Sequence, residues 1–171
     1  MNYKLHQLDF SIPAQQVFEI IKNEDWSVFL NSNNKKYPDQ RFDILSASPK
    51  QKIVFSNECT YLINEDQQPK RTDLCPFELL REVMSKYKSN TDSDIPFSGG
   101  AIGYISYDYG NHVHNIQNKN DYLNYPLFAF GIYDWAVIYD YTQEKSFLLY
   151  HEKNTITENI INNYKKSSES K

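Results

Sequence analysis

Few side chains in this sequence have the residue types and the spacing that chemistry requires. His112 and His114 are separated by one residue, so a strand would place both imidazoles on one side, where they could bind a metal ion. No cysteine, aspartate or glutamate stands at a spacing that completes the ligand set, and the surrounding sequence has the polar composition of a loop. We therefore expect an exposed polar loop at these histidines and predict no metal site in this chain.

Three aspartates lie in or beside the two most apolar segments: Asp108, Asp134 and Asp140. Paired carboxylates can act as a general acid and a general base. No nucleophile or electrophile accompanies them, so we expect Asp108 to cap a helical turn and Asp134 to bind backbone or tyrosine hydroxyl groups. We predict no catalytic residue in the chain.

The glycines are gathered in one part of the chain, where Gly99, Gly100 and Gly103 form a GGxxG pattern. A phosphate-binding loop needs its glycines between a strand and the start of a helix. These glycines precede and enter a predicted strand, and no Lys or Ser/Thr follows at P-loop spacing. We expect them to allow close packing of that strand instead.

Composition limits the partners that the chain can have. Tyr104, Tyr107 and Tyr109 could stack on bases, but the net charge of −4 and the pI near 5.5 provide no basic groove for nucleic acid. The sequence shows no signal-peptide pattern and no apolar stretch of membrane-spanning length, so we expect a cytoplasmic protein without a membrane partner. In such a reducing compartment Cys59 and Cys75 are expected to stay unpaired.

One constellation has the character of a ligand site. A polar turn leaves one predicted strand at Ser32 and enters the next at Arg41, so backbone and side-chain donors converge beside an apolar sheet, as a small amphipathic ligand requires. An ordinary turn is the alternative, and the residues alone favour it. The candidate site residues are Ser32, Asp39, Gln40, Arg41 and Phe42.

The periodicity of apolar residues predicts the elements that position these side chains. Strands are expected over 1–12, 26–32, 42–47, 52–56, 60–63, 99–108, 127–141 and 146–150, with a buried strand at 26–32 and an exposed loop at 64–73. Helices are expected over 13–22, after a cap at Asp73, briefly within 111–124, and after a cap at Thr155 or Thr157. The helix after Asp73 should bury one stripe, namely Phe77, Leu80, Val83, Met84 and Tyr87.

Short connections favour antiparallel pairing, so we predict an α+β fold: a mainly antiparallel twisted sheet covered by helices, in one domain over residues 1–171. The segments Gly99–Asp108 and Leu127–Asp140 should be central strands that pack side by side.

Three segments together resemble a known family. They are DWSVFLNSNNKKYPDQRFDILSASP (25–49), PFSGGAIGYISYDYG (96–110) and FGIYDWAVIYD (130–140), within a resemblance that extends from Phe18 to His151. In this order they are similar to the N-terminal region of component I of para-aminobenzoate (aminodeoxychorismate) synthase, in the anthranilate synthase component I family. The strand at Arg41–Ile44 and the GIYDWAVIYD segment look closer to the aminodeoxychorismate branch.

The resemblance implies a fold and a function. In the family this region is the N-terminal part of a larger α/β sandwich, which a C-terminal chorismate-binding domain completes. Chorismate, Mg²⁺ and the catalytic acid and base residues belong to that domain, which has no counterpart here, so no cofactor is expected in this chain. The expected partners are a chorismate-binding C-terminal chain and a glutamine amidotransferase subunit.

The leading hypothesis is therefore a noncatalytic N-terminal component of aminodeoxychorismate synthase component I, not active alone. It would complete the fold of a separate chorismate-binding chain, which forms 4-amino-4-deoxychorismate from chorismate on the route to para-aminobenzoate and folate. The alternatives are a stand-alone module that binds an aromatic amino acid such as tryptophan, and an inactive truncated remnant.

The resemblance also bears on the candidate ligand site. In the family a Leu-x-Ser sequence and the residues leading into an Arg-Phe-Asp strand line a tryptophan pocket, whose other wall comes from the C-terminal domain. Leu30, Ser32 and Arg41–Phe42 match that pattern. Asn31 replaces the acidic residue that precedes the serine in feedback-sensitive anthranilate synthases, which argues against regulation by free tryptophan.

Overall fold

The computed structural model describes residues 3–32, 40–65, 67–87, 94–116 and 125–164. The chain divides into two compact units, each built around its own sheet. Unit 1 comprises Met1–Ser48, Ser89–Gly100 and Tyr133–Lys171, and unit 2 comprises Pro49–Lys88 and Ala101–Ile132. The fold is α+β, as predicted, and the described residues form two antiparallel sheets and four helices. That residues 1–171 act as one domain stays a prediction.

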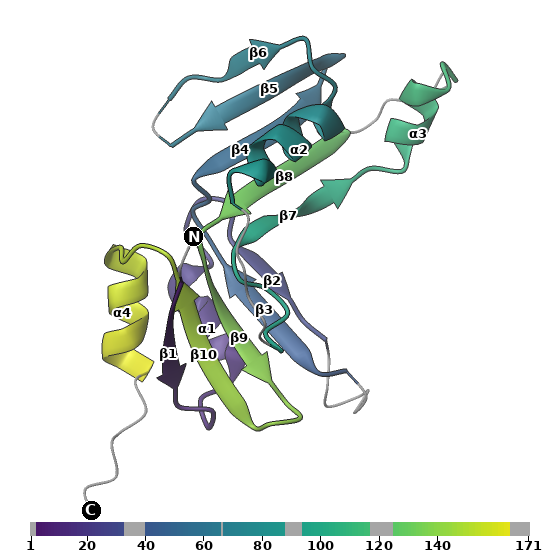
Figure 1. The fold of residues 1–171 in the computed structure, drawn as a ribbon. Coiled ribbons are helices and arrows are strands. Elements are labelled where there is room, and N and C mark those ends of the chain that lie inside the picture. The colour runs from purple at the N-terminus through teal and green to yellow at the C-terminus, as the bar shows by residue number, and fades with distance from the viewer. Residues whose placement is uncertain (1–2, 33–39, 66, 88–93, 117–124, 165–171) are drawn as a thin grey trace, which may run out of the picture. The chain divides into compact units, whose positions relative to one another are not determined.

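Unit 1 contains a five-stranded sheet in the order β1-β10-β9-β3-β2, and neighbouring strands are antiparallel throughout (Figure 1). Its strands are β1 (Lys4–Leu8), β2 (Val28–Leu30), β3 (Phe42–Ser46), β9 (Trp135–Asp140) and β10 (Lys145–Tyr150). Its helices are α1 (Ala14–Ile21) and α4 (Thr155–Tyr164). The sheet thus joins strands from both ends of the sequence, with the unit 2 residues inserted between β3 and β9.

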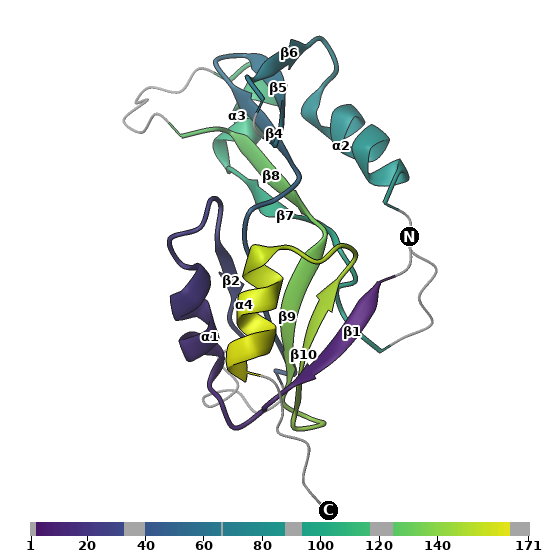
Figure 2. The ribbon, with the colours of Figure 1, turned by 90° about the vertical axis from the view of Figure 1, so that its left-hand side faces the viewer.

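Both helices of unit 1 cover the same face of its sheet (Figure 2). Val17 on α1 and Ile160 on α4 pack against Trp135 and Val137 of β9, and all four side chains are fully buried. Because alternate residues of a strand point to opposite faces, Trp135, Val137 and Tyr139 point toward the helices together. This burial of large apolar side chains is the main stabilising contribution of unit 1.

Unit 2 contains the second five-stranded sheet, in the order β6-β5-β4-β8-β7. Its strands are β4 (Gln51–Ser56), β5 (Cys59–Asn64), β6 (Lys70–Thr72), β7 (Gly100–Ile105) and β8 (Phe128–Tyr133), and its helices are α2 (Pro76–Ser85) and α3 (Asp108–Val113). Ile53, Phe55 and Phe128 of the sheet form a core with Leu79 and Val83 of α2. The predicted β4–β5 hairpin is confirmed, with Asn57 and Glu58 both at positive φ in its turn.

The expected central strand pair is only partly confirmed. The predicted strand over 127–141 is divided at Asp134 into β8 and β9, which belong to different sheets. The glycine-rich strand, β7, does lie beside β8, but at the edge of its sheet. It ends at Ile105, and Asp108 begins α3.

Helix α2 differs from its predicted pattern. Cys75, and not Asp73, is the N-cap residue, and Glu78 accepts a hydrogen bond from the Cys75 backbone N–H at 3.1 Å. Leu79 and Val83 are buried on this helix, while Phe77 is 42% exposed. The predicted stripe was therefore right at Val83, largely right at Leu80, Met84 and Tyr87, which are half-buried against the same core, and wrong at Phe77.

Three smaller predictions were also wrong. The strand at 26–32 is shortened to β2, which is half-buried at a sheet edge, and Trp26 before it adopts a positive φ. The expected loop at 64–73 contains β6, which pairs with β5. The side chain of Asn154, rather than Thr155 or Thr157, caps α4 by accepting the backbone N–H of Thr157 at 2.8 Å.

Within the described ranges, no helix combines the length and the apolar character needed to cross a membrane. Cys59 and Cys75 are both free thiols, the first half-buried and the second exposed.

Candidate functional site

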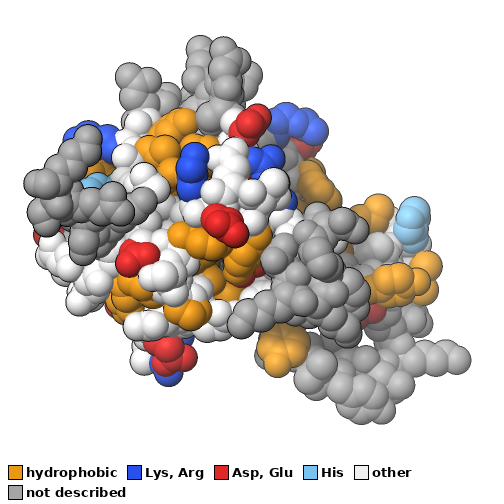
Figure 3. Space-filling model, turned by 90° about the horizontal axis from the view of Figure 1, so that it is seen from below, with side chains coloured by type: hydrophobic (Ala, Val, Ile, Leu, Met, Phe, Trp, Pro, Cys, Tyr) orange, Lys and Arg blue, Asp and Glu red, His pale blue; other side chains and the backbone are white. Residues whose placement is uncertain are grey.

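A pocket of about 360 Å³ opens at one end of the unit 1 sheet. It is formed by the loop between β1 and α1, the first turn of α1, and the chain where β2 ends, β3 begins and β9 ends. Its lining residues are Phe10, Ser11, Ile12, Pro13, Ala14, Gln15, Asn31, Asp43, Tyr139 and Tyr141. Viewed from below Figure 1, hydrophobic side chains reach the surface between acidic and basic ones (Figure 3).

The most buried charge-bearing group of the pocket is the carboxyl of Asp43, whose residue is only 1% exposed. Its Oδ1 accepts the backbone N–H of Ser32 at 2.7 Å and the Ser32 hydroxyl at 2.9 Å. Its Oδ2 accepts the phenol of Tyr141 at 2.7 Å. These donors compensate for the loss of water at a buried carboxylate.

The phenols of the pocket are held in their neutral form. Burial, followed by the hydrogen bond to Asp43 and its negative charge, raises the pKa of Tyr141. Burial is also the main cause that raises the pKa of Tyr139, whose hydroxyl donates to the Ile12 carbonyl at 2.8 Å. Tyr141 can therefore act as a hydrogen-bond donor to Asp43 at any physiological pH.

Aromatic rings provide the apolar wall of the pocket. The ring of Phe10 lies 6.0 Å from the rings of both Tyr139 and Tyr141, and the two tyrosine rings stack at 6.3 Å. This spacing is typical of favourable ring contacts, so the three rings form a continuous surface. Such a surface suits a flat apolar group.

The start of α1 contributes a region of positive potential. Pro13 occupies the N-cap and supplies no capping side chain, while Ala14 and Gln15 line the pocket. The first amides of a helix have no partner inside the helix, and its dipole is positive at this end. The pocket therefore combines a helix start, a buried carboxylate and aromatic rings, which together could contact an anionic, a cationic and a flat apolar part of a small ligand.

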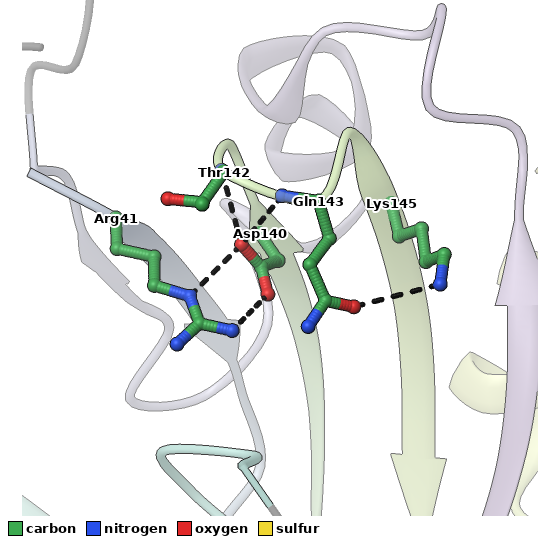
Figure 4. A network of polar contacts seen from close by, with 5 residues as sticks. All are labelled: Arg41, Asp140, Thr142, Gln143 and Lys145. Atoms are coloured by element: carbon green, nitrogen blue, oxygen red, sulfur yellow. Dashed lines mark hydrogen bonds and ion pairs between the residues drawn. The ribbon is translucent and has the colours of Figure 1, made fainter.

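Arg41 belongs to a separate network at the start of β3 (Figure 4). Its Nε and Nη2 donate to Asp140 Oδ1 and Oδ2 at 3.1 and 2.7 Å, and its guanidinium lies 4.4 Å from the Phe42 ring centroid. The backbone N–H groups of Thr142 and Gln143 also donate to Asp140 Oδ1, at 3.0 and 3.1 Å. This network fixes the turn between β9 and β10 to the start of β3.

The pKa values of this pair reflect its geometry. Burial alone would raise the pKa of Asp140, but the hydrogen bonds from Arg41, Gln143 and Thr142 and the charge of Arg41 outweigh it, so the pKa lies below its usual value. The hydrogen bond to Asp140 raises the pKa of Arg41. Both groups are therefore charged at neutral pH.

The structure separates the predicted site residues. Ser32 is bound to Asp43, a pocket residue, whereas Arg41 is bound to Asp140. Phe42 lies under the guanidinium of Arg41, Gln40 is exposed beside it, and Asp39 lies outside the described residues. That these five residues form a ligand site stays a prediction.

Sequence reasoning missed Asp43 and the loop Phe10–Gln15. Asp43 occupies an ordinary strand position, and only its pairing with Tyr139 on β9 shows that it faces the pocket side of the sheet. The only signal in the sequence was a charged residue between Phe42 and Ile44 in an otherwise apolar strand.

His112, His114 and Asp108, which the sequence also offered as reactive side chains, lie on or beside α3 and outside the pocket. His112 and His114 are exposed, as expected, but His112 belongs to α3, where its ring lies 4.7 Å from that of Phe55. Asp108 accepts the Asn111 amide at 3.1 Å, as a first-turn residue of α3. Among the described residues, no group of three or more His, Cys, Asp and Glu side chains could hold a metal ion.

The fold resembles that of part of anthranilate synthase component I. The chain superposes on a crystal structure of anthranilate synthase component I from Streptococcus pneumoniae with a TM-score of 0.54 and 26% sequence identity, over 86% of this chain and 31% of that one. No family model matches the sequence.

Curated proteins of similar sequence belong to two synthases. The chain is 29% identical over 141 residues to aminodeoxychorismate synthase component 1 of Escherichia coli, which covers 81% of this chain and 31% of the relative. It is 29% identical over 133 residues to anthranilate synthase component 1 of Lactococcus lactis, which covers 77% of this chain and 28% of the relative. The chain is thus homologous to the component 1 proteins of these two synthases. It spans about 30% of their length, a partial coverage that fits an N-terminal region.

Proposed function

We propose that this chain is the noncatalytic N-terminal part of an aminodeoxychorismate synthase component 1 and that it completes the fold of a chorismate-binding polypeptide. The observation that carries this proposal is the homology over 81% of this chain but only 31% of the Escherichia coli relative. The larger polypeptide would form 4-amino-4-deoxychorismate from chorismate, with ammonia from a glutamine amidotransferase subunit, in the cytoplasm and on the route to folate.

The contents of the described residues support a noncatalytic role. The carboxylates of Asp43 and Asp140 are each engaged by protein donors. We therefore assign metal binding and the reacting groups to the chorismate-binding polypeptide and derive no chemical step from this chain.

Reconstitution tests the proposal. The chain is mixed with the part of Escherichia coli aminodeoxychorismate synthase component 1 that it does not match, and 4-amino-4-deoxychorismate formation is measured with chorismate, ammonia and Mg²⁺. We expect activity only when both polypeptides are present. Turnover by this chain alone, or two polypeptides that neither associate nor react, would contradict it.

The pocket of unit 1 supports a second candidate function, binding of an aromatic amino acid such as tryptophan. The helix start at Ala14, the carboxylate of Asp43 and the ring of Phe10 match the three parts of such a ligand. Half of the family's pocket would come from the chorismate-binding polypeptide, so we expect weak binding by this chain alone.

Calorimetry with L-tryptophan tests this second function. We expect Asp43→Asn to weaken binding about tenfold or more, because loss of one charged hydrogen bond costs about 1.5–3 kcal/mol. Asp140→Asn is the matched control, since it removes another buried carboxylate of the same sheet outside the pocket. No heat at millimolar tryptophan, with or without the second polypeptide, would exclude this function.

A further inference from the structure

Large apolar side chains are exposed very unevenly in the described residues. Leu5 and Leu30 are the two such side chains in unit 1. Unit 2 has Leu74, Phe77, Tyr104, Ile105, Tyr107, Val113, Ile116 and Tyr125. Single exposed apolar residues are normal on a protein surface, whereas a concentration of them marks an interaction site. The surface of unit 2 therefore requires an explanation that the surface of unit 1 does not.

The second half of β7 is the centre of this concentration. Gly103, Tyr104 and Ile105 are all exposed, and β7 is an edge strand of the unit 2 sheet. Tyr104 and Ile105 are consecutive, so they point to opposite faces, and each is 46% exposed. This end of β7 thus presents apolar side chains on both faces and, among the described residues, a backbone edge with no neighbouring strand.

The other edge of the same sheet has a different character. Strand β6 has only three residues, and two of them, Lys70 and Arg71, are charged and exposed. Short edges that carry charge are the usual protection of a sheet against pairing with another chain. Strand β7 has six residues, GAIGYI, and none is charged. It lacks the protection that β6 has.

The exposed end of β7 continues into a larger surface. Tyr107, two residues beyond the strand, is 93% exposed, and Tyr125 is 68% exposed. The backbone N–H of Ser106, just beyond the strand, donates to the Leu127 carbonyl at 2.8 Å, which brings the chain at Tyr125 near the end of β7. We call the group Tyr104, Ile105, Tyr107 and Tyr125 the β7 patch.

We propose that the β7 patch is the docking surface for the chorismate-binding polypeptide, and that an extended segment of that polypeptide adds to the unit 2 sheet along β7. Main-chain hydrogen bonds along an open edge provide affinity, and apolar side chains on the two faces provide specificity. The proposal rests on the proposed function, because it identifies the surface through which the two polypeptides would join.

The length of the relatives favours this occupant over a second copy of the chain. Only 31% of the solved anthranilate synthase component I chain is matched by this chain. In that protein, more than two thirds of the polypeptide is additional to the part that resembles this chain. The uncharged character of β7 also suits an apolar partner.

The test compares two variants whose substituted side chains are equally exposed in the unmodified chain. Tyr104→Lys/Ile105→Lys places charge on β7, and Leu5→Lys places charge on β1, an edge strand of the unit 1 sheet whose Leu5 is also 46% exposed. Binding of each variant to the unmatched part of Escherichia coli aminodeoxychorismate synthase component 1 is measured by sedimentation velocity. Circular dichroism and urea unfolding confirm that both variants remain folded.

We expect the β7 variant to bind at least tenfold more weakly and Leu5→Lys to bind as the unmodified chain does. We also expect the amides of Gly100–Ile105 to become protected from hydrogen exchange in the complex. Equal binding by both variants would overturn the docking surface and leave the proposed function intact. An unmodified chain that does not bind would overturn both. Self-association that the β7 variant abolishes would identify a second copy as the occupant and overturn this proposal.

Discussion

At the scale of single residues, the unit 1 sheet stabilises two buried carboxylates in different ways. Asp43 is bound by the hydroxyl and backbone of Ser32 and by the phenol of Tyr141. Asp140 is bound by the guanidinium of Arg41. A carboxylate held by neutral donors at a pocket can still attract a ligand cation, whereas one paired with arginine is already neutralised. Asp140 therefore has a structural role, and Asp43 is the carboxylate on which the proposed ligand binding depends.

The Arg41–Asp140 pair predicts a dependence of stability on pH. Because the pKa of Asp140 is lowered in the folded chain, its stabilising contribution is complete above the unfolded value of 3.8 and is lost as the pH falls through the lower native pKa. We expect Asp140→Asn to reduce the free energy of unfolding at pH 7 by about 1–2 kcal/mol, since partial exposure of Arg41 screens the pair. Urea unfolding should show a smaller difference near pH 2.5.

A matched control is the exposed Glu19–Lys22 pair on α1. Glu19→Gln should change the free energy of unfolding little at either pH, because exposed pairs contribute little. An Asp140→Asn variant as stable as the unmodified chain at pH 7 would contradict the structural role of this carboxylate.

Sequence reasoning singled out Ser32, which donates to Asp43, but not Asp43 itself. Ser32 was recognised because it stands at the end of an apolar segment before a polar turn. Asp43 was missed because its role depends on Tyr141, which lies 98 residues away in the chain and donates to it. A contact between distant residues is set by strand pairing, which apolar periodicity alone does not encode.

At the scale of elements, the sequence predicted most strands and helices but not the sheets to which they belong. Residues 127–141 are almost continuously apolar, so they were predicted as one strand. The residues of β8 and β9 are nearly all buried, and hence no change in pattern marks Asp134 as the point where the chain passes from one sheet to the other. The cap of α2 was misplaced because Cys75 is a less typical N-cap residue than Asp73.

The glycine at position 103 is required for the packing of β7 on β8. A Cβ atom at Gly103 would lie 2.0 Å from the Ala129 carbonyl oxygen and 2.6 Å from the Phe130 Cα, so the strands would have to separate. We expect Gly103→Ala to lower the free energy of unfolding by about 1–3 kcal/mol, as overpacking does. Gly110→Ala is the control, because nothing lies within 4 Å of its added Cβ. Equal urea midpoints for the two variants would contradict this close approach.

The β4–β5 turn predicts a stabilising change. Asn57 and Glu58 have φ values of 50° and 59°, a conformation that asparagine tolerates and glutamate does not favour. We expect Glu58→Gly to raise the free energy of unfolding by about 1 kcal/mol, because glycine adopts positive φ without strain. Asn57→Ala should have the opposite sign. Thermal unfolding would refute this if Glu58→Gly lowered the midpoint.

At the scale of the whole chain, the structure has two separate hydrophobic cores. The unit 1 core includes Val17 and Trp135, and the unit 2 core includes Leu79 and Phe128, with no residue in common. The sequence could not predict this division, because unit 2 is an insertion within unit 1 and no linker-like composition marks its boundaries. It did predict the fold class, because short connections between amphipathic segments restrict the pairing to antiparallel neighbours.

Because the cores are separate, we predict that a large-to-small substitution in one core leaves the amides of the other unit protected from hydrogen exchange. Leu79→Ala removes a side chain that is 4% exposed from the unit 2 core, and Val17→Ala removes a fully buried one from the unit 1 core. Large-to-small changes in a core cost about 2–5 kcal/mol for leucine, and the smaller valine should cost less. We expect hydrogen exchange to accelerate in β4 and β8 for Leu79→Ala, and in β9 and β10 for Val17→Ala. If either variant accelerated exchange equally in all these strands, the chain would unfold as one cooperative body, and docking on unit 2 would stabilise unit 1 as well.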